Sequence, residues 1–125
     1  MGVYVFQSVH GPYVKVGHYA RQNAWSRVAH RGFASCAKPH PELPVASHAD
    51  VELVAWFPAY TRADEAAVKR GCQGSRRRTP RGGGLTEWYD AAALPAILAL
   101  LASRGGLECA AGCNKSEALA TRRRL

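Results

Sequence analysis

Two short apolar runs near the N-terminus begin the hydrophobic pattern of this chain. Val3 to Val9 and Tyr13 to Gly17 are rich in β-branched and aromatic residues, a composition typical of strands. The turn signal Gly11-Pro12 lies between them. Two strands with so short a connection predict an antiparallel hairpin.

A helical pattern follows the predicted hairpin. Asn23 is a good N-cap residue, and apolar residues recur after it at the i, i+3, i+4 spacing of one helix face. These apolar residues are Trp25, Val28 and Ala29. The pattern predicts a helix from about Ala24 to Arg31 with this face toward the core.

The middle and end of the chain predict one more strand and two more helices. Val51 to Phe57 is almost continuously apolar, which predicts a central strand covered on both faces. Thr61 and Asp64 form a capping-box pattern, so a helix is expected from about Arg62 to Arg70. Another helix is expected from about Ala91 to Ser103. Its apolar stripe consists of Leu94, Ile97, Leu98 and Leu101.

Together these elements predict an α/β fold: a small three-stranded antiparallel sheet flanked by helices, in the order β-β-α-β-α-α. With 125 residues the chain is long enough for one independent core. We expect one domain over residues 1–105 and a basic C-terminal tail over residues 106–125, with a short helix near Glu117. The proline-rich link from Ala34 to Asp50 is either a loop over a substrate or a surface insertion.

The charge balance favours a polyanionic partner. Lysine and arginine number 17 against 9 aspartates and glutamates, which gives a net charge of +8. This favours nucleic acid over a membrane as the partner. A basic, glycine-rich loop is expected over residues 73–84; its arginines suit phosphate contacts, and the alternative is a solvated loop. The expected nucleic-acid-binding residues are Arg31, Arg76, Arg77, Arg78 and Arg81.

The sequence gives no sign of a membrane or secretory protein. No apolar run approaches the roughly 20 residues that span a bilayer, and the N-terminus lacks the basic segment of a signal peptide. We expect an intracellular protein, cytoplasmic or associated with the nucleoid or nucleus, with no membrane partner.

The cysteines of the chain contain no C-x-x-C pair, so reduced thiols are favoured over structural zinc. The oligomeric state is left open.

The stretch from Val3 to Arg27 contains several residues that can titrate or carry charge, among them Tyr4, Lys15, His18 and Arg27. Gly2-Val3-Tyr4, then Lys15-Val16-Gly17, then an arginine on the next helix resemble the GIY-YIG nuclease superfamily. The likeness is closer to the branch whose second motif ends K-[IV]-G. Thr86-Glu87-Trp88-Tyr89 is similar to the E-W-[FY] element of that branch.

The resemblance implies a metal-dependent endonuclease that hydrolyses phosphodiester bonds in DNA. Tyr4 would orient or deprotonate the attacking water, since neighbouring positive charge favours the phenolate. Lys15 would help to activate the nucleophile and steady the phosphate. His18 would hydrogen-bond Tyr4 or shuttle its proton, and Arg27 would clamp the scissile phosphate. Glu65 would hold the divalent ion, Mg²⁺ or Mn²⁺.

Some residues depart from the pattern of that family. Lys15 and His18 have opposite strand parity, so both reach one site only if the chain bends near Gly17. The family commonly has a histidine shortly after its catalytic glutamate, where this chain has Lys69 and Arg70. Two other functions therefore stay open: a catalytically inactive nucleic-acid-binding module on the same fold, and a protein-interaction or regulatory domain.

Overall fold

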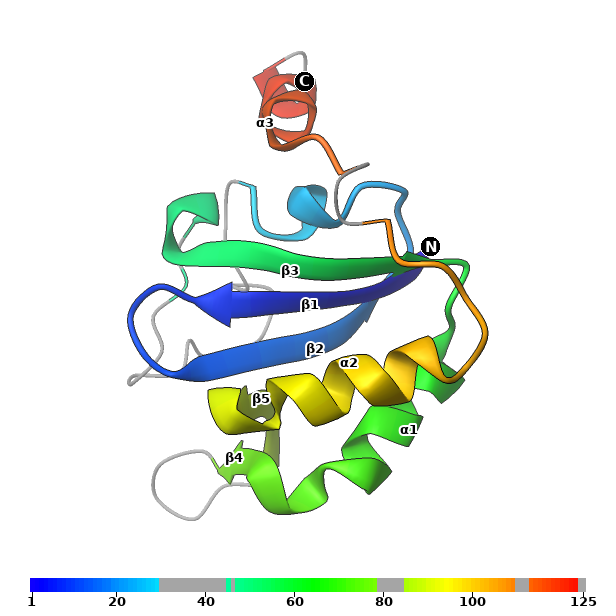
Figure 1. The fold of residues 1–125 in the computed structure, drawn as a ribbon. Coiled ribbons are helices and arrows are strands. Elements are labelled where there is room, and N and C mark those ends of the chain that lie inside the picture. Colours follow the sequence, from blue (N-terminus) through cyan, green and yellow to red (C-terminus); the bar gives the residue numbers. More distant parts are fainter. Residues whose placement is uncertain (30–44, 46, 79–84, 110–112, 124–125) are drawn as a thin grey trace.

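The computed structural model describes residues 1–29, 45, 47–78, 85–109 and 113–123. Within these residues the strands form one five-stranded sheet in the order β3-β1-β2-β5-β4, with every neighbouring pair antiparallel (Figure 1). The strands are β1 (Gly2–Ser8), β2 (Tyr13–Tyr19), β3 (Val51–Pro58), β4 (Arg76–Arg78) and β5 (Leu85–Asp90). The α/β class and the N-terminal hairpin are confirmed.

The prediction of a three-stranded sheet is wrong, because β4 and β5 add two strands beyond β2. β5 pairs with β2 from Tyr13–Asp90 to Lys15–Trp88. β4 is the outermost strand, and its three arginines carry no apolar signal. Pairing with β5 makes it extended, although the sequence predicts a loop there.

β3 lies at the opposite edge of the sheet, so the prediction of a central position is also wrong. Its apolar run is explained by coverage of both faces. A bulge where its register shifts opposite Val5/Phe6 lets Val51 and Trp56, which differ in parity, enter the same apolar cluster. The backbone N–H of Cys109 donates to the Trp56 carbonyl at 2.6 Å, so a later segment covers part of this edge.

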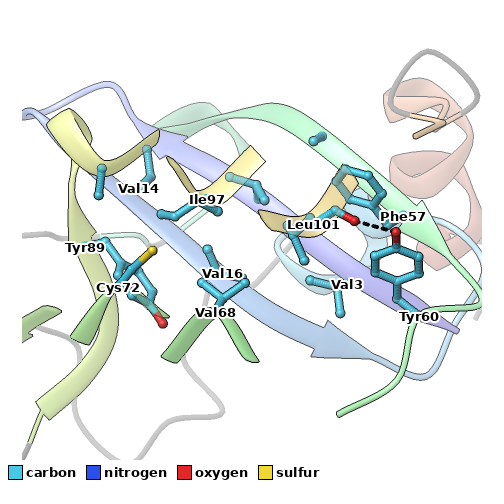
Figure 2. Packing of buried hydrophobic residues seen from close by; sticks show 13 residues of the cluster. Val3, Val14, Val16, Phe57, Tyr60, Val68, Cys72, Tyr89, Ile97 and Leu101 are labelled. Atoms are coloured by element: carbon cyan, nitrogen blue, oxygen red, sulfur yellow. Dashed lines mark hydrogen bonds between the residues drawn. The ribbon is translucent and has the colours of Figure 1, made fainter. Parts of the chain in front are cut away.

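Two α-helices, α1 (Arg62–Gly71) and α2 (Leu94–Ala102), lie together on one side of the sheet (Figure 1). Ile97 and Leu101 of α2 and Val68 of α1 are buried against valines of β1 and β2 (Figure 2). The predicted stripe of α2 and the Thr61–Asp64 capping box of α1 are both confirmed. We call this side the aliphatic face.

A 3₁₀-helix, η1 (Ala24–Arg27), covers the other side of the sheet, and the helix α3 (Lys115–Arg123) packs against η1. Aromatic rings dominate the buried cluster on this side of the sheet, and we call this side the aromatic face. These rings belong to Tyr4, Phe6, Trp25, Trp56 and Trp88. The predicted α-helix over Ala24–Arg31 is replaced by a 3₁₀ turn ending at Arg27, and residues 30 and 31 lie outside the described residues.

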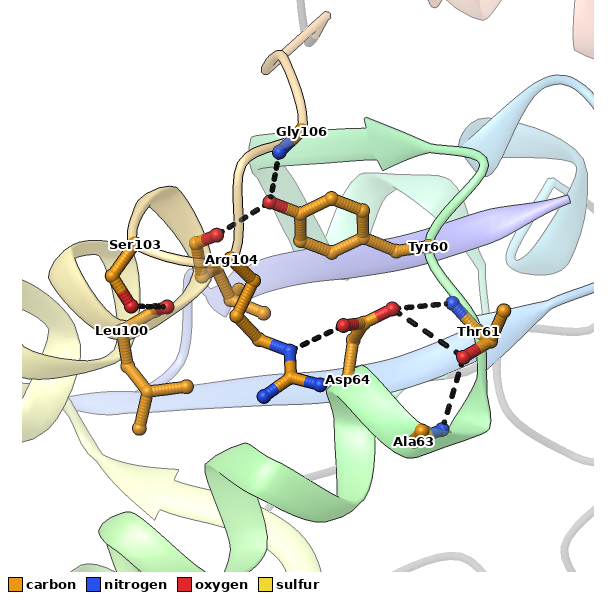
Figure 3. Close-up of polar contacts among 9 residues, drawn as sticks. Tyr60, Thr61, Ala63, Asp64, Leu100, Ser103, Arg104 and Gly106 are labelled. Carbon is orange, nitrogen blue, oxygen red and sulfur yellow. Dashed lines mark hydrogen bonds and ion pairs between the residues drawn. The ribbon is translucent and has the colours of Figure 1, made fainter.

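The C-terminal segment connects the two faces. Tyr60 donates its hydroxyl hydrogen to the Leu101 carbonyl at 2.5 Å and accepts from the Gly106 N–H at 2.9 Å, which fixes the chain as it leaves α2 (Figure 3). The helix expected near Glu117 is present as α3, and Ala118 is buried in the aromatic cluster. No helix among the described residues is long and apolar enough to cross a membrane.

Candidate active site

Tyr4 and Lys15 share the aromatic face of the sheet. Lys15 is paired directly with Phe6, and Tyr4 lies two residues before Phe6 on the same strand. Tyr4 is paired with Gly17, and a Cβ at Gly17 would overlap the hydroxyl and ring of Tyr4. Glycine is therefore required at position 17 because the Tyr4 side chain lies across the backbone of β2.

Lys15 joins this face to β5. Its side chain is only 5% exposed, and its ammonium donates to Oε2 of Glu87 at 3.2 Å. The same ammonium lies 6.0 Å from the centroid of the Trp88 ring. Lys15–Trp88 is the last pair of the β2–β5 ladder, so Glu87 sits where β5 leaves β2. This opening lets Lys15 reach the carboxylate.

Helix α1 contributes Glu65 and Lys69 to the same cluster. The Lys69 ammonium lies 3.2 Å from Oε1 of Glu65 and 3.6 Å from Oε1 of Glu87. The Lys69 ammonium therefore bridges the two carboxylates. Lys15, Glu65, Lys69 and Glu87 therefore form one charge cluster built from β2, α1 and β5. We call it the lysine–glutamate cluster.

The two carboxyl groups of this cluster are electrostatically unequal. Burial and the neighbouring carboxyl group of Glu87 raise the pKa of Glu65 despite the opposing charge of Lys69. Burial would also raise the pKa of Glu87, but the charges of Lys15 and Lys69, with the neighbouring Glu65, together lower it. Glu87 is thus the stronger acid of the two.

The donor set of the cluster fits a divalent ion that keeps most of its water ligands. Mg²⁺ commonly binds through one or two carboxylates, and Glu65 and Glu87 both contact the Lys69 ammonium. The Tyr89 hydroxyl is buried without a hydrogen-bond partner among the described residues. Burial raises the pKa of Tyr89 against the opposing charge of Arg76, and the nearby charges of Glu65 and Glu87 add to the increase. No group of three or more His, Cys, Asp or Glu side chains in the described part of the chain is arranged to hold a metal ion by itself.

His18 lies apart from Tyr4 and Lys15. It is paired with Val3, whose side chain belongs to the aliphatic face, so His18 points to that side. Partial burial, the Arg62 guanidinium and the N-terminal ammonium lower the pKa of His18. The chain does not bend enough at Gly17 to place the imidazole with the Tyr4 hydroxyl.

Arg27 comes from η1, the 3₁₀-helix that packs on the aromatic face. Its neighbours Ala24, Trp25 and Val28 are buried there, and the Trp25 ring lies edge-on to Phe6 with centroids 5.2 Å apart. Arg27 itself is half-buried. Its helix thus covers the same sheet face as Tyr4.

The arginines expected to contact nucleic acid are partly engaged within the protein. The guanidinium of Arg76 donates to the Thr86 carbonyl at 3.1 Å. Arg77 stacks over the Tyr13 ring at 4.3 Å and lies 3.6 Å from Asp90. Both side chains therefore fasten β4 to the sheet. Arg31 and Arg81 lie outside the described residues.

Sequence reasoning assigned no role to Glu87 or Lys69, although both belong to the cluster. Glu87 lies in the Thr86–Tyr89 element that carried part of the resemblance, and Lys69 is one helical turn after Glu65. These two sequence positions are the features from which a role for Glu87 and Lys69 could have been suspected. The ion pairs themselves join Lys15 to a residue far along the chain, which no local pattern encodes.

No family model matches this chain, and no curated protein or solved structure matches it significantly. The likeness to GIY-YIG nucleases therefore depends on the sequence motifs alone.

Proposed function

We propose that this protein is a divalent-metal-dependent endonuclease that hydrolyses phosphodiester bonds in DNA. The observation that carries the proposal is the lysine–glutamate cluster, which joins Lys15 of β2 to Glu65 of α1 through Glu87 and Lys69. Lys15 shares its sheet face with Tyr4. Lys15 thus links the face that carries Tyr4 to Glu65, whose helix lies on the aliphatic face.

Phosphodiester hydrolysis needs an activated water, positive charge at the phosphate and a path for the leaving-group proton. In the proposed reaction Tyr4 orients the attacking water, and the positive charge of Lys15 helps to activate that water. Arg27 clamps the phosphate from η1 with its planar guanidinium. We assign no step to His18, because its imidazole points away from the face that carries Tyr4.

Glu65 and Glu87 would hold Mg²⁺ or Mn²⁺, which when bound supplies charge stabilisation at the phosphate. Lys15 helps to keep Glu87 ionised and ready as a ligand, since its charge lowers the pKa of that carboxyl group. Glu65 loses its proton less readily because its pKa is raised, so metal loading should increase as the pH rises through that pKa.

A plasmid-nicking assay with Mg²⁺, Mn²⁺ or EDTA tests the proposal. We expect supercoiled plasmid to become nicked and linear with either metal and to stay intact in EDTA. A labelled RNA of matched sequence in the same buffers decides between DNA and RNA as substrate. Intact plasmid under every metal condition, with DNA binding retained, would contradict the endonuclease proposal.

That outcome would favour the second candidate, a catalytically inactive nucleic-acid-binding module. The position of His18 supports this alternative, because its imidazole points away from the face that carries Tyr4. The net charge of +8 suits nucleic-acid binding in either case.

A further inference from the structure

The two lysines of the lysine–glutamate cluster differ in their access to solvent. The Lys15 side chain is 5% exposed, whereas that of Lys69 is 34% exposed. Both ammonium groups contact carboxylates of the cluster. A phosphate that approaches from solvent can therefore contact Lys69 without displacing the protein around it, but cannot contact Lys15 in this way.

Lys69 also has the geometry to move from carboxylate to phosphate. Its contacts with Glu65 and Glu87, at 3.2 and 3.6 Å, are those of a partly exposed ion pair, which contributes little stability. The four-carbon stem lets the ammonium rotate away from one carboxylate while it remains near the other. Since Lys69 is beside both carboxylates, a phosphate bound at that pair would lie within its reach.

We infer that Lys69 is a catalytic residue of this site, whose ammonium binds a non-bridging oxygen of the scissile phosphate. This inference rests on the proposed function, because it takes the lysine–glutamate cluster as the place where the phosphodiester binds. It makes Lys69 the solvent-facing positive charge of the cluster, with Lys15 as the buried one. The interaction is electrostatic and needs no proton transfer from Lys69.

Salt dependence of DNA binding gives a readout that does not need cleavage. A fluorescein-labelled 16-base-pair duplex is titrated with protein in EDTA at a series of salt concentrations. Loss of one phosphate contact should lower the slope of log Kd against log salt by about one unit. We expect this change in Lys69→Met, with most of the slope kept in Lys69→Arg, which retains the charge.

Arg70→Met is the matched control. Arg70 is the next residue on α1 and is exposed. Its replacement by Met removes one positive charge, as Lys69→Met does, so this variant measures any general effect of net charge. We expect its slope to equal that of the wild type. In the nicking assay, Lys69→Met should lower kcat by about 100-fold, comparable to loss of one electrostatic contact to a transition state.

Unchanged slope and unchanged kcat in Lys69→Met would overturn the inference. Equal losses in Lys69→Met and Arg70→Met would also overturn it, because general charge would then explain the effect. Should Lys69→Met melt at a lower temperature, Lys69→Gln and Lys69→Arg provide the same comparison. A wild type that binds DNA but never cleaves it would refute the endonuclease proposal, while the slopes would still decide whether Lys69 contacts phosphate.

Discussion

The two faces of the sheet are built from different chemistry. The aliphatic face packs Val, Ile and Leu side chains of β1, β2, α1 and α2, and the hydroxyl of Tyr60 finds two backbone partners there. The aromatic face packs large rings against η1 and α3, and it also admits the buried ammonium of Lys15. Aromatic rings fill space while offering polar tips and ring faces to charged groups. We infer that the aliphatic face supplies most of the stability, whereas the proposed chemistry draws on Tyr4 and Lys15 from the aromatic face and on carboxylates of α1 and β5.

The largest expected effect is on the aliphatic face. Ile97→Ala removes a fully buried side chain between α2 and the strands, which should lower the free energy of unfolding by about 2–5 kcal/mol. Leu107→Ala is the control, because Leu107 is 84% exposed and should change stability by less than about 0.5 kcal/mol. Urea denaturation measures both. A cost below about 1 kcal/mol for Ile97→Ala would show that this face is not the main source of stability.

A smaller loss of stability, with a larger loss of function, is expected on the aromatic face. In Gly17→Ala the new methyl group overlaps the hydroxyl and ring of Tyr4, so Tyr4 must move. We expect a cost of about 1–3 kcal/mol in unfolding free energy. Nicking activity should fall far more than that cost explains, since the protein stays folded.

Gly74→Ala provides the control for that substitution. A Cβ at Gly74 meets no atom within 4 Å, and the backbone there has no positive φ. Its stability and nicking rate should match those of the wild type. Full nicking activity in Gly17→Ala, with its melting temperature lowered as expected, would show that Tyr4 has no role in DNA cleavage.

The smallest effects are expected where a polar side chain on each face is replaced and its hydrogen bonds are lost. On the aliphatic side, Asp64 accepts hydrogen bonds from the Thr61 N–H at 2.7 Å and from Arg104 (Figure 3). On the aromatic side, Asn23 caps η1 and donates to the Asn114 carbonyl at 2.8 Å. We expect Asp64→Asn and Asn23→Ala each to cost about 1 kcal/mol at pH 7.

The stability costs of Asp64→Asn and Asn23→Ala should depend differently on pH. Burial would raise the pKa of Asp64, but the Thr61 amide and Arg104 lower it below its ordinary value of 3.8. A lowered carboxyl pKa stabilises the fold above pH 3.8, and that contribution is lost as the pH falls through the folded pKa. The difference between wild type and Asp64→Asn should therefore shrink below about pH 3.8, whereas the difference for Asn23→Ala should stay constant. Thermal melts from pH 7 to pH 2 measure this, and parallel behaviour of the two variants would contradict it.

The parts of the fold that the sequence predicted are those with strong local signals. Alternating and apolar runs identified β1, β2 and β3, and the Thr61–Asp64 pair located the start of α1. β4 could not be found this way, because Arg76, Arg77 and Arg78 become a strand only by pairing with β5. The edge position of β3 also depends on pairings that the apolar run does not encode.

For the candidate site, too, local features could be predicted from the sequence and tertiary contacts could not. Strand parity predicted that Lys15 and His18 point to opposite faces, and the register confirms it. The roles of Lys69 and Glu87 required the structure, because their contacts depend on the point where β5 leaves β2 and on the rotation of α1. Residue types suggested the chemistry, whereas tertiary packing selected which of them share one cluster.

The central claim is that the lysine–glutamate cluster is a hydrolytic site, and Glu65→Gln tests it most directly. The amide keeps the shape of Glu65 but removes the charge that a divalent ion needs, while Glu117→Gln on α3 removes an exposed carboxylate as the control. The account predicts that single-turnover cleavage of DNA in Mg²⁺ falls by at least about 100-fold in Glu65→Gln, with DNA affinity and melting temperature preserved, and is unchanged in Glu117→Gln. Wild-type cleavage by Glu65→Gln would contradict it.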